Sequence, residues 1–233
     1  MAVARVNGIE LYFELHGAGA PLLLIPGLGG DVRMFKHIIG GLAGRCRVLA
    51  FDPRGAGRSG KPDVPYSIEM MADDAAGLLR AVEMPMAHVL GFSMGGRVAL
   101  ELALAHPEHV KGLILASTSA RTVEPSPMSW RWVVMDLLPR LPLPRRIDPQ
   151  PRFAHLRQRA ASRAYDCTAR LGDINVPTLI LHGRRDRIIP HELAVELRHG
   201  IAGSNLVTVN GGHFALLTRE RRHLIDAVTD FAS

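Results

Sequence analysis

A serine stands between two glycines in the segment "HVLGFSMGGRV", residues 88–98. Gly91 and Gly95 lie two positions before and after Ser93; an apolar run precedes the serine and an apolar-periodic run follows it. Glycines at this spacing fit a sharp turn from a strand into a helix, because side chains there would collide with the turn. Such a turn exposes the serine hydroxyl at the end of the strand. The pattern therefore predicts a nucleophile, although the two glycines alone also fit an ordinary loop.

A serine hydroxyl is a weak nucleophile until a base takes its proton, and the usual base is a histidine held by a carboxylate. Position favours His213 among the eleven histidines, because it lies in the glycine-rich loop "NGGHF" after the last apolar run. Asp186 lies in "LHGRRDRIIP", the loop after the preceding run, and His182 is expected to bond locally at that strand's end. Parallel strands would bring Ser93, Asp186 and His213 to one edge of a sheet. We therefore predict that these three residues form a catalytic triad.

Two backbone amides are candidates for binding an oxyanion at the same edge. The segment "LLLIPGLGGD" ends a predicted strand in a glycine-rich loop, where the Leu28 N–H is free to point inward. The helix after Ser93 begins at Met94, and the first N–H groups of a helix have no partner within it. We expect Leu28 and Met94 to form the oxyanion hole, since such donors stabilise the charge that develops in acyl transfer. A glycine-rich turn without a ligand role is the alternative.

Short apolar runs alternate with helical patterns along the chain, and these elements would position the candidate residues. Near-continuous Val, Ile and Leu runs are typical of strands buried on both faces of a parallel sheet. Asn7 and Gly8 predict a two-residue hairpin turn between the first two strands. The predicted fold class is α/β, a mostly parallel eight-stranded sheet flanked by helices. Beyond the opening strand, strands are predicted at 9–15, 21–27, 47–55, 88–93, 112–118, 177–183 and 205–213, and helices at 31–42, 67–83, 94–106, 191–199 and 219–231.

One segment, residues 119–170, breaks this alternation. It contains no strand pattern and is rich in proline, whereas its stretches 129–138 and 152–167 are compatible with helix. A poorly ordered connection is one explanation. We favour a short, mainly helical cap at 119–170, inserted into a core that is formed by residues 1–118 and 171–233.

Both tryptophans of the chain, Trp130 and Trp132, lie in this predicted cap. Tryptophans are on average well buried, so both are expected to have packing partners. Together with Met135 they could line a pocket for a small apolar or aromatic acyl group. Packing between cap helices explains their presence equally well, so both explanations stay open.

Composition excludes several classes of protein. The chain has 233 residues, a hydrophobic fraction of 47% and a net charge of +6, which fits one domain with a sizeable core. The arginines are scattered, which favours solvated surface charge over nucleic-acid binding but leaves an anionic substrate possible. No apolar run approaches the roughly 20 residues that span a bilayer, and the first residues lack a secretory pattern. We therefore expect a cytoplasmic protein, with a homodimer as one option, and no nucleic-acid or membrane partner.

The two cysteines, Cys46 and Cys167, bear on cofactors and redox chemistry. They are too few for a disulfide framework and their spacing matches no metal site. We expect both to be neutral or buried thiols. Neither a metal nor an organic cofactor is expected.

Five motifs together resemble the α/β-hydrolase superfamily, over essentially the whole chain. They are "PGLGGD", "DPRGAGRS", "GFSMGG", "LHGRRDRIIP" and "GGHF". The Ser-Met-Gly-Gly turn is similar to that of 3-oxoadipate enol-lactonases, cofactor-free haloperoxidase-type esterases and related carboxylesterases. The chain order Ser93, Asp186, His213 is also that of the superfamily. The resemblance implies an α/β-hydrolase fold with Ser93 as nucleophile, Asp186 as acid and His213 as base.

The expected function is that of a serine hydrolase whose substrate is a small carboxylic ester or lactone, cleaved through an acyl-enzyme. A serine at position 93 argues against relatives of this fold that use an aspartate there, such as haloalkane dehalogenases and epoxide hydrolases. Two alternatives stay open. One is a C–C bond hydrolase or lyase that uses the same triad, and the other is a non-catalytic small-molecule receptor on this fold.

Overall fold

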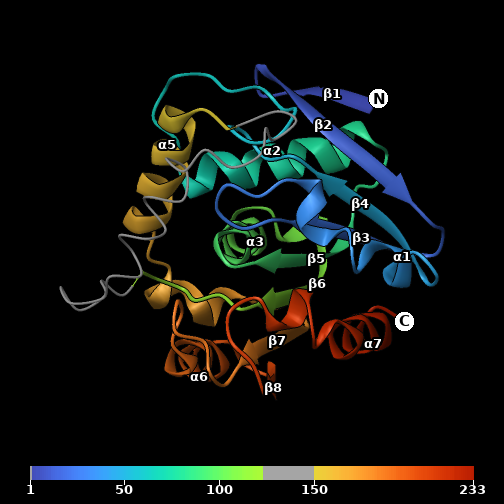
Figure 1. Cartoon of the computed structure of the whole chain (residues 1–233), viewed down its shortest axis with the longest axis vertical. Coiled ribbons are helices and arrows are strands. Elements are labelled where there is room, and N and C mark those ends of the chain that lie inside the picture. Colours follow the sequence, from blue (N-terminus) through green and yellow to red (C-terminus); the bar gives the residue numbers. More distant parts are fainter. Residues whose placement is uncertain (1, 123–149) are drawn as a thin grey trace.

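A single mixed sheet forms the centre of the protein (Figure 1). The computed structural model describes residues 2–122 and 150–233. In these residues eight strands pair in the order β1-β2-β4-β3-β5-β6-β7-β8. The pairs β1–β2 and β2–β4 are antiparallel and the other pairs are parallel, which confirms the predicted fold class. The strands are β1 (Ala2–Val6), β2 (Ile9–His16), β3 (Ala20–Ile25), β4 (Cys46–Phe51), β5 (Ala87–Phe92), β6 (Val110–Ala116), β7 (Thr178–Gly183) and β8 (Asn205–Val209).

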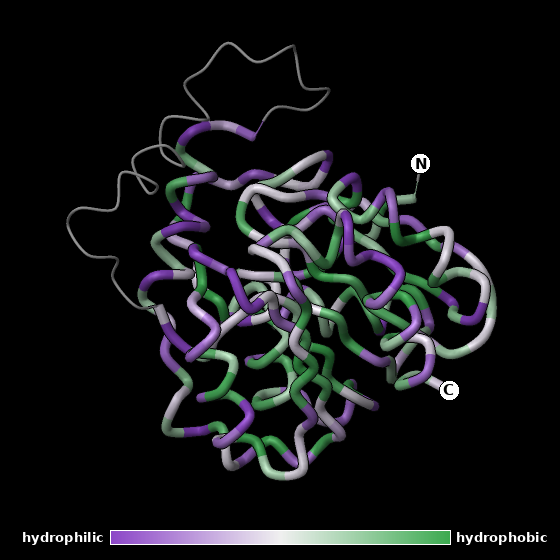
Figure 2. The backbone as a smooth tube through the Cα atoms, turned by 60° about the horizontal axis from the view of Figure 1, so that its bottom comes forward, coloured by the Kyte–Doolittle hydropathy of each residue, from purple (hydrophilic) through white to green (hydrophobic). Residues whose placement is uncertain are grey.

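The central strands are apolar on both faces because each face packs against helices. In β3, Leu23 and Ile25 belong to one hydrophobic core, whereas Leu22 and Leu24 belong to the core on the opposite face. Figure 2 shows the same layering, with hydrophobic segments concentrated inside the molecule. Successive side chains of a strand point to opposite faces of the sheet, and here both faces are buried. The strands therefore appear in the sequence as continuous apolar runs.

Helices cover both faces of the sheet. Side chains of α2, α3 and α6 contribute to one core, and those of α1 and α7 contribute to the other. In α2 the Ser67 side chain accepts a hydrogen bond from the Met70 N–H, which caps the first turn. The α-helices of the described residues are α1 (Ile39–Leu42), α2 (Ile68–Ala81), α3 (Met94–Ala105), α5 (Arg152–Ala164), α6 (His191–Gly200) and α7 (Arg221–Phe231).

The hairpin between β1 and β2 has the predicted turn. Val6 pairs with Ile9, so Asn7 and Gly8 form a two-residue connection. Both have positive φ, 46° and 78°. Asn and Gly tolerate this backbone conformation, which the right-handed twist of the two strands requires.

The single helix predicted over 31–42 is wrong. The chain forms a 3₁₀ turn at Val32–Phe35 and then the short helix α1, Ile39–Leu42. Two consecutive isoleucines and two consecutive glycines at 38–41 lower the helix propensity of this stretch. Gly41 also packs against α7, because a Cβ there would lie 2.6 Å from Cδ1 of Ile225.

The helix predicted within 152–167 is confirmed as α5, Arg152–Ala164. In Figure 1 it stands across the ends toward which β5, β6 and β7 point, and it ends before a 3₁₀ turn at Thr168–Asp173. The predicted helix at 129–138 lies outside the described residues. The division of the chain into a core and a cap at 119–170 stays a prediction.

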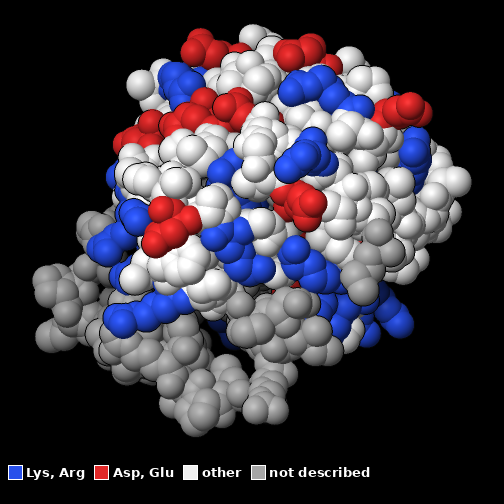
Figure 3. Space-filling view, turned by 90° about the horizontal axis from the view of Figure 1, so that it is seen from above, with Lys and Arg blue, Asp and Glu red and all other residues white. Residues whose placement is uncertain are grey.

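Three further expectations concern the membrane, the thiols and the surface charge. No helix in the described part of the chain is long and apolar enough to cross a membrane. Cys46 and Cys167 are free and buried, and burial raises the pKa of both thiols, as expected for inert cysteines. Figure 3 shows basic and acidic side chains interspersed over most of the face that it presents.

Candidate active site

Ser93 lies at the turn between β5 and α3, in a strained backbone conformation. Its φ and ψ are 55° and −120°, which a residue with a Cβ rarely adopts. The Ser93 N–H donates to Ala116 O at 3.0 Å, and the Thr118 hydroxyl donates to Ser93 O at 2.7 Å. These bonds to the end of β6 hold the strained turn in place. Strain of this kind persists only where the surrounding structure enforces it, and it is concentrated at functional sites.

Gly91 and Gly95 are required by the close approach of backbone atoms. A Cβ at Gly91 would lie 2.3 Å from Gly95 O, and one at Gly95 would lie 2.2 Å from Ile25 O. Both distances are too short for any side chain. The spacing of glycines around Ser93 is therefore a steric requirement of the turn, as the sequence predicted.

Ser93, His213 and Asp186 meet at the carboxyl edge of the sheet. His213 Nε2 lies 3.0 Å from Ser93 Oγ, and His213 Nδ1 lies 2.7 Å from Asp186 Oδ2. An ionised carboxylate only accepts hydrogen bonds, so Nδ1 carries the proton and Nε2 is left to accept from the serine. Asp186 and His213 are 6% and 7% exposed, which shields their hydrogen bond from water. This arrangement can activate a hydroxyl as a nucleophile.

The Asp186 carboxylate is held from several sides. Its Oδ1 accepts from the N–H groups of Ile188 and Ile189, each at 2.9 Å. His182 is fully buried behind it, with Nε2 3.0 Å from Ile189 O and 3.5 Å from Asp186 Oδ2. Burial lowers the pKa of His182, and the acceptors around Nε2 oppose this only in part. His182 is therefore a neutral ring that donates to the loop carrying Asp186.

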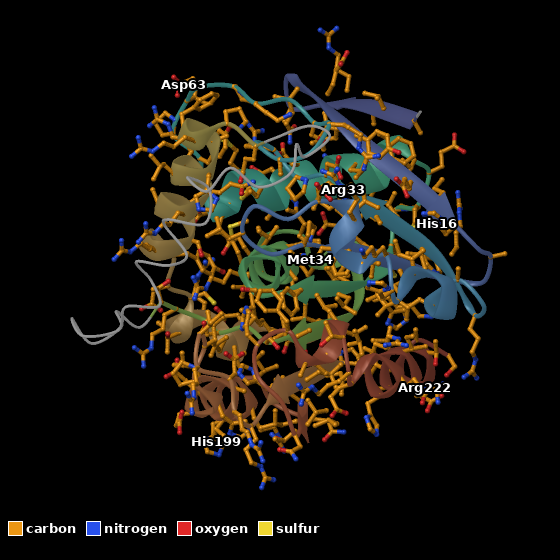
Figure 4. The ribbon with its side chains drawn as sticks, in the orientation of Figure 1. His16, Arg33, Met34, Asp63, His199 and Arg222 are labelled. Carbon is orange, nitrogen blue, oxygen red and sulfur yellow. The ribbon has the colours of Figure 1, made fainter. Side chains whose placement is uncertain are left out.

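The two predicted oxyanion donors line the same cavity as Ser93. Within the described ranges, the N–H groups of Leu28 and Met94 donate to no other group. Two hydrogen bonds fix the loop around Leu28. Gly29 N–H donates to Oε1 of Gln158 at 3.0 Å, and Gly27 N–H donates to the sulfur of Met34 at 3.4 Å. Met34 is labelled in Figure 4. Two preorganised amides without partners beside a serine hydroxyl can bind a developing oxyanion.

A cavity of about 100 Å³ opens beside Ser93. Its apolar lining is suited to a small acyl group, and its polar lining includes three arginines besides several hydroxyl groups. No Asp or Glu is among the lining residues that the structure describes. Nor do three or more His, Cys, Asp or Glu side chains in the described part of the chain gather as a metal site would require. The lining residues include Leu28, Phe92, Ile188, Ile189, Leu193 and Phe214, together with Arg97, Ser119, Thr122, Arg159, Ser162 and Arg163.

The predicted pocket residues stay a prediction. Trp130, Trp132 and Met135 lie outside the described residues. Arg97 and Gln158 are buried at the site and are not among the predicted site residues. Arg97 carried a signal, since an arginine one turn after Ser93 in an otherwise apolar helix is unusual. Gln158 carried none, because the two loop groups that it holds, Gly29 N–H and Arg54 O, lie more than a hundred residues away.

The "DPRGAGRS" loop is held in place by two of its charged residues. Asp52 is fully buried and accepts from the Val32 N–H at 2.9 Å and from the Arg58 N–H at 2.8 Å. Arg54 instead forms a buried ion pair with Asp74, with 2.7 Å between Nε and Oδ2. These contacts hold the loop behind the oxyanion segment.

Comparison with known proteins agrees with this fold. The family model described as "alpha/beta hydrolase fold" matches residues 20–159. The chain is 32% identical to "Putative carbamate hydrolase RutD" of Azorhizobium caulinodans, with 92% of each chain covered. It is also 32% identical to the 2-hydroxymuconate semialdehyde hydrolase of Pseudomonas sp. strain CF600, over 92% of this chain and 88% of that protein. The crystal structure of the enol-lactonase from Burkholderia xenovorans LB400 is similar, with a TM-score of 0.86, 27% identity and 99% of each chain covered.

Proposed function

The chain belongs to the α/β-hydrolase family, and we propose that it is a serine hydrolase of small carboxylic esters or lactones. The observation that carries this proposal is the continuous hydrogen-bonded line from Ser93 Oγ through His213 to Asp186. The family supports a hydrolase, and this line supports a covalent route through the serine.

In the proposed acylation step, Ser93 Oγ attacks the carbonyl carbon while His213 Nε2 takes the hydroxyl proton. The imidazolium that forms is stabilised by Asp186. The amides of Leu28 and Met94 hold the oxyanion of the tetrahedral intermediate. His213 then gives its proton to the leaving alkoxide, which departs as an alcohol and leaves the acyl group on Ser93.

Deacylation repeats these steps with water. His213 takes a proton from a water molecule, and the resulting hydroxide attacks the acyl-enzyme carbonyl. Collapse of the second intermediate returns the proton to Ser93 Oγ and releases the carboxylic acid. A lactone follows the same course, except that the alcohol stays attached to the acid that leaves.

A second candidate is hydrolysis of a carbon–carbon bond next to a carbonyl by the same three side chains. The likeness to a 2-hydroxymuconate semialdehyde hydrolase favours it. The likeness to a carbamate hydrolase adds carbamates to the substrates that deserve an assay. All these reactions share an acyl-type intermediate, so trapping the intermediate would not separate them. The rates with different substrates do separate them.

The test is a substrate panel assayed with the wild-type protein and with Ser93→Ala. The panel contains nitrophenyl esters of increasing acyl length, aliphatic and enol lactones, aryl carbamates and a vinylogous diketone. We expect esters or lactones to give the highest kcat/KM. A clear preference for the diketone would replace this proposal by the second candidate.

A fluorophosphonate probe separates an enzyme from a receptor on the same fold. The proposal predicts covalent labelling of Ser93 in the folded protein and none after heat denaturation, because activation depends on His213. A folded protein that binds small esters but resists the probe would be a receptor.

A further inference from the structure

Arg97 is a buried cation in the cavity that the proposed acyl-transfer chemistry does not use. It lies one turn after Ser93 in α3, lines the cavity beside the serine and is only 6% exposed. Burial lowers its pKa to about 10. The guanidinium is therefore still charged near neutral pH. A buried charge is costly unless something compensates it.

The groups that hold Arg97 are all neutral oxygens. Nη1 donates to the hydroxyls of Thr122 and Ser162, each at 2.7 Å, and to Ser162 O at 2.8 Å. Nη2 donates to the Ser119 hydroxyl at 2.9 Å and to Arg121 O at 3.1 Å, and Nε donates to Ser119 O at 3.4 Å. Every nitrogen of the guanidinium thus donates to an oxygen of the protein. Arg97, Ser119, Thr122 and Ser162, all of which line the cavity, are termed the arginine sub-pocket below.

No carboxylate of the described residues forms an ion pair with Arg97. The acidic residue one turn further along α3, Glu101, accepts from the Tyr165 hydroxyl at 2.9 Å and pairs with Arg170 instead. The Asp186 carboxylate is held by His213 and two backbone amides. The described chain thus fixes a positive charge at the cavity without supplying a negative one.

We propose that the arginine sub-pocket binds a second, anionic group of the substrate, so that the preferred ester or lactone carries a free carboxylate in addition to the scissile carbonyl. This inference rests on the proposed function, because it names the substrate class of the same cavity. A carboxylate beside the guanidinium supplies the missing counter-charge in a site of low dielectric. It interacts with Arg97 through the charge, because the nitrogens of the guanidinium already donate to oxygens of the protein.

The sub-pocket also offers a hydrogen-bond donor for the carboxylate. The hydroxyls of Ser119 and Thr122 donate to Arg121 O and Ser162 O respectively. Ser162 Oγ accepts from Arg97 and, within the described residues, donates to nothing. Its proton is therefore available. Arg159 and Arg163 of α5 line the same cavity.

The primary test compares matched substrates with the wild-type protein. Mono-(4-nitrophenyl) esters of glutaric and adipic acid are assayed against analogues in which a terminal carboxamide replaces the carboxylate. We expect kcat/KM for the better carboxylate ester to exceed that of its carboxamide by about tenfold or more, the discrimination expected of a buried charged hydrogen bond. Equal values, or a preference for the carboxamide, would overturn the inference.

The variants then assign the preference to a residue. Arg97→Gln should reduce the carboxylate-to-carboxamide ratio to near one, and Arg97→Lys should keep part of it because the charge remains. Arg170→Gln removes an arginine of the same region that does not line the cavity, and it should leave the ratio unchanged. The ratio is the measured quantity, because lost stability lowers both rates together. An undiminished ratio in Arg97→Gln would exclude the sub-pocket as the site.

The two proposals fail in different ways. If the wild-type protein hydrolyses neutral nitrophenyl acetate but shows no carboxylate preference, only this inference fails. If it hydrolyses no ester, the proposed function fails, and calorimetry on Ser93→Ala with glutarate and glutaramide still tests the anion site. Binding of glutarate that is lost in the double variant with Arg97→Gln would support the sub-pocket, whereas equal affinity for both compounds would refute it.

Discussion

Two parts of one cavity are built in different ways. The proposed reactive corner, formed by Ser93, Asp186, His213 and the two candidate oxyanion amides, comes from residues that follow strands, and its carboxylate is hydrogen-bonded to His213. The arginine sub-pocket joins side chains of α3, of the segment after β6 and of α5, and it holds a cation that forms no ion pair with a carboxylate of the described residues. Chain topology determines the corner, whereas side-chain identity determines the sub-pocket. The proposed chemistry is therefore tied to the fold, and the proposed substrate preference can change without altering it.

Asp186→Asn should have the largest effect and should act on the corner alone. An amide in place of the carboxylate favours the wrong imidazole tautomer, so kcat should fall by roughly 10³–10⁴-fold. The loss should be equal for the carboxylate and carboxamide esters, which steady-state kinetics on both will show. A loss confined to the carboxylate ester would mean that the two parts of the cavity are not separable.

Gln158→Leu should have an intermediate effect, because this residue of α5 supports the oxyanion loop. Gln158 is fully buried, accepts from the Gly29 N–H and donates to Arg54 O at 2.8 Å. Without Gln158 we expect kcat to fall by about tenfold for the carboxylate and the carboxamide ester alike, because the loops lose the hydrogen bonds to Gly29 N–H and Arg54 O. Gln150→Ala is the matched control, because Gln150 donates to the same Oε1 and, within the described residues, forms no hydrogen bond with Gly29 N–H or Arg54 O. An unchanged kcat in Gln158→Leu would mean that α5 does not support the proposed oxyanion hole.

Ser162→Ala should act on the sub-pocket alone, with a smaller effect. It removes one hydroxyl donor for the carboxylate and leaves the Arg97 charge in place. We expect the carboxylate-to-carboxamide ratio of kcat/KM to fall by about three- to tenfold, the value of one hydrogen bond. The carboxamide ester should be hydrolysed nearly as fast as before, and equal losses for both esters would contradict the assignment.

His88→Leu should have the smallest effect, and it concerns stability rather than activity. His88 lies at the far end of β5 from Ser93, is 5% exposed, and has no partner for either ring nitrogen in the described part of the chain. Burial, helped by Lys111, lowers the pKa of His88, so below about pH 6.5 the unfolded chain binds a proton that the folded one does not. The contribution of His88 to the free energy of unfolding is therefore fully present above about pH 6.5, and it is lost as the pH falls toward the lowered pKa of His88 in the folded protein.

Urea denaturation at about pH 7 and about pH 5.5 checks this expectation. The pH dependence of the unfolding free energy should shrink in the variant, by at most about 1.4 kcal/mol per pH unit in the window concerned. His182, whose pKa is also lowered by burial, should leave a residual slope. An identical slope in wild type and variant would mean that His88 titrates normally.

The contrast between the corner and the sub-pocket also shows which features could be predicted from the sequence. The sheet, the Asn7-Gly8 turn and the three residues of the corner could be predicted, because each follows from local spacing: alternation, turn residues, or a position just after a strand. The break in the helix at 31–42 depends on packing against Ile225 and on local propensity, which a periodic pattern does not show. The sub-pocket joins residues 25 and 65 positions away from Arg97, so no local pattern could identify it.

The most direct test of the central claim is to isolate the acyl-enzyme. The protein is mixed with 4-nitrophenyl acetate, quenched in acid within the first turnover and digested for mass spectrometry. The account predicts one acetyl group on Ser93 in the wild-type protein and none there in Ser93→Ala. Turnover without any acetylated intermediate, or an acetyl group that maps to another residue, would contradict it.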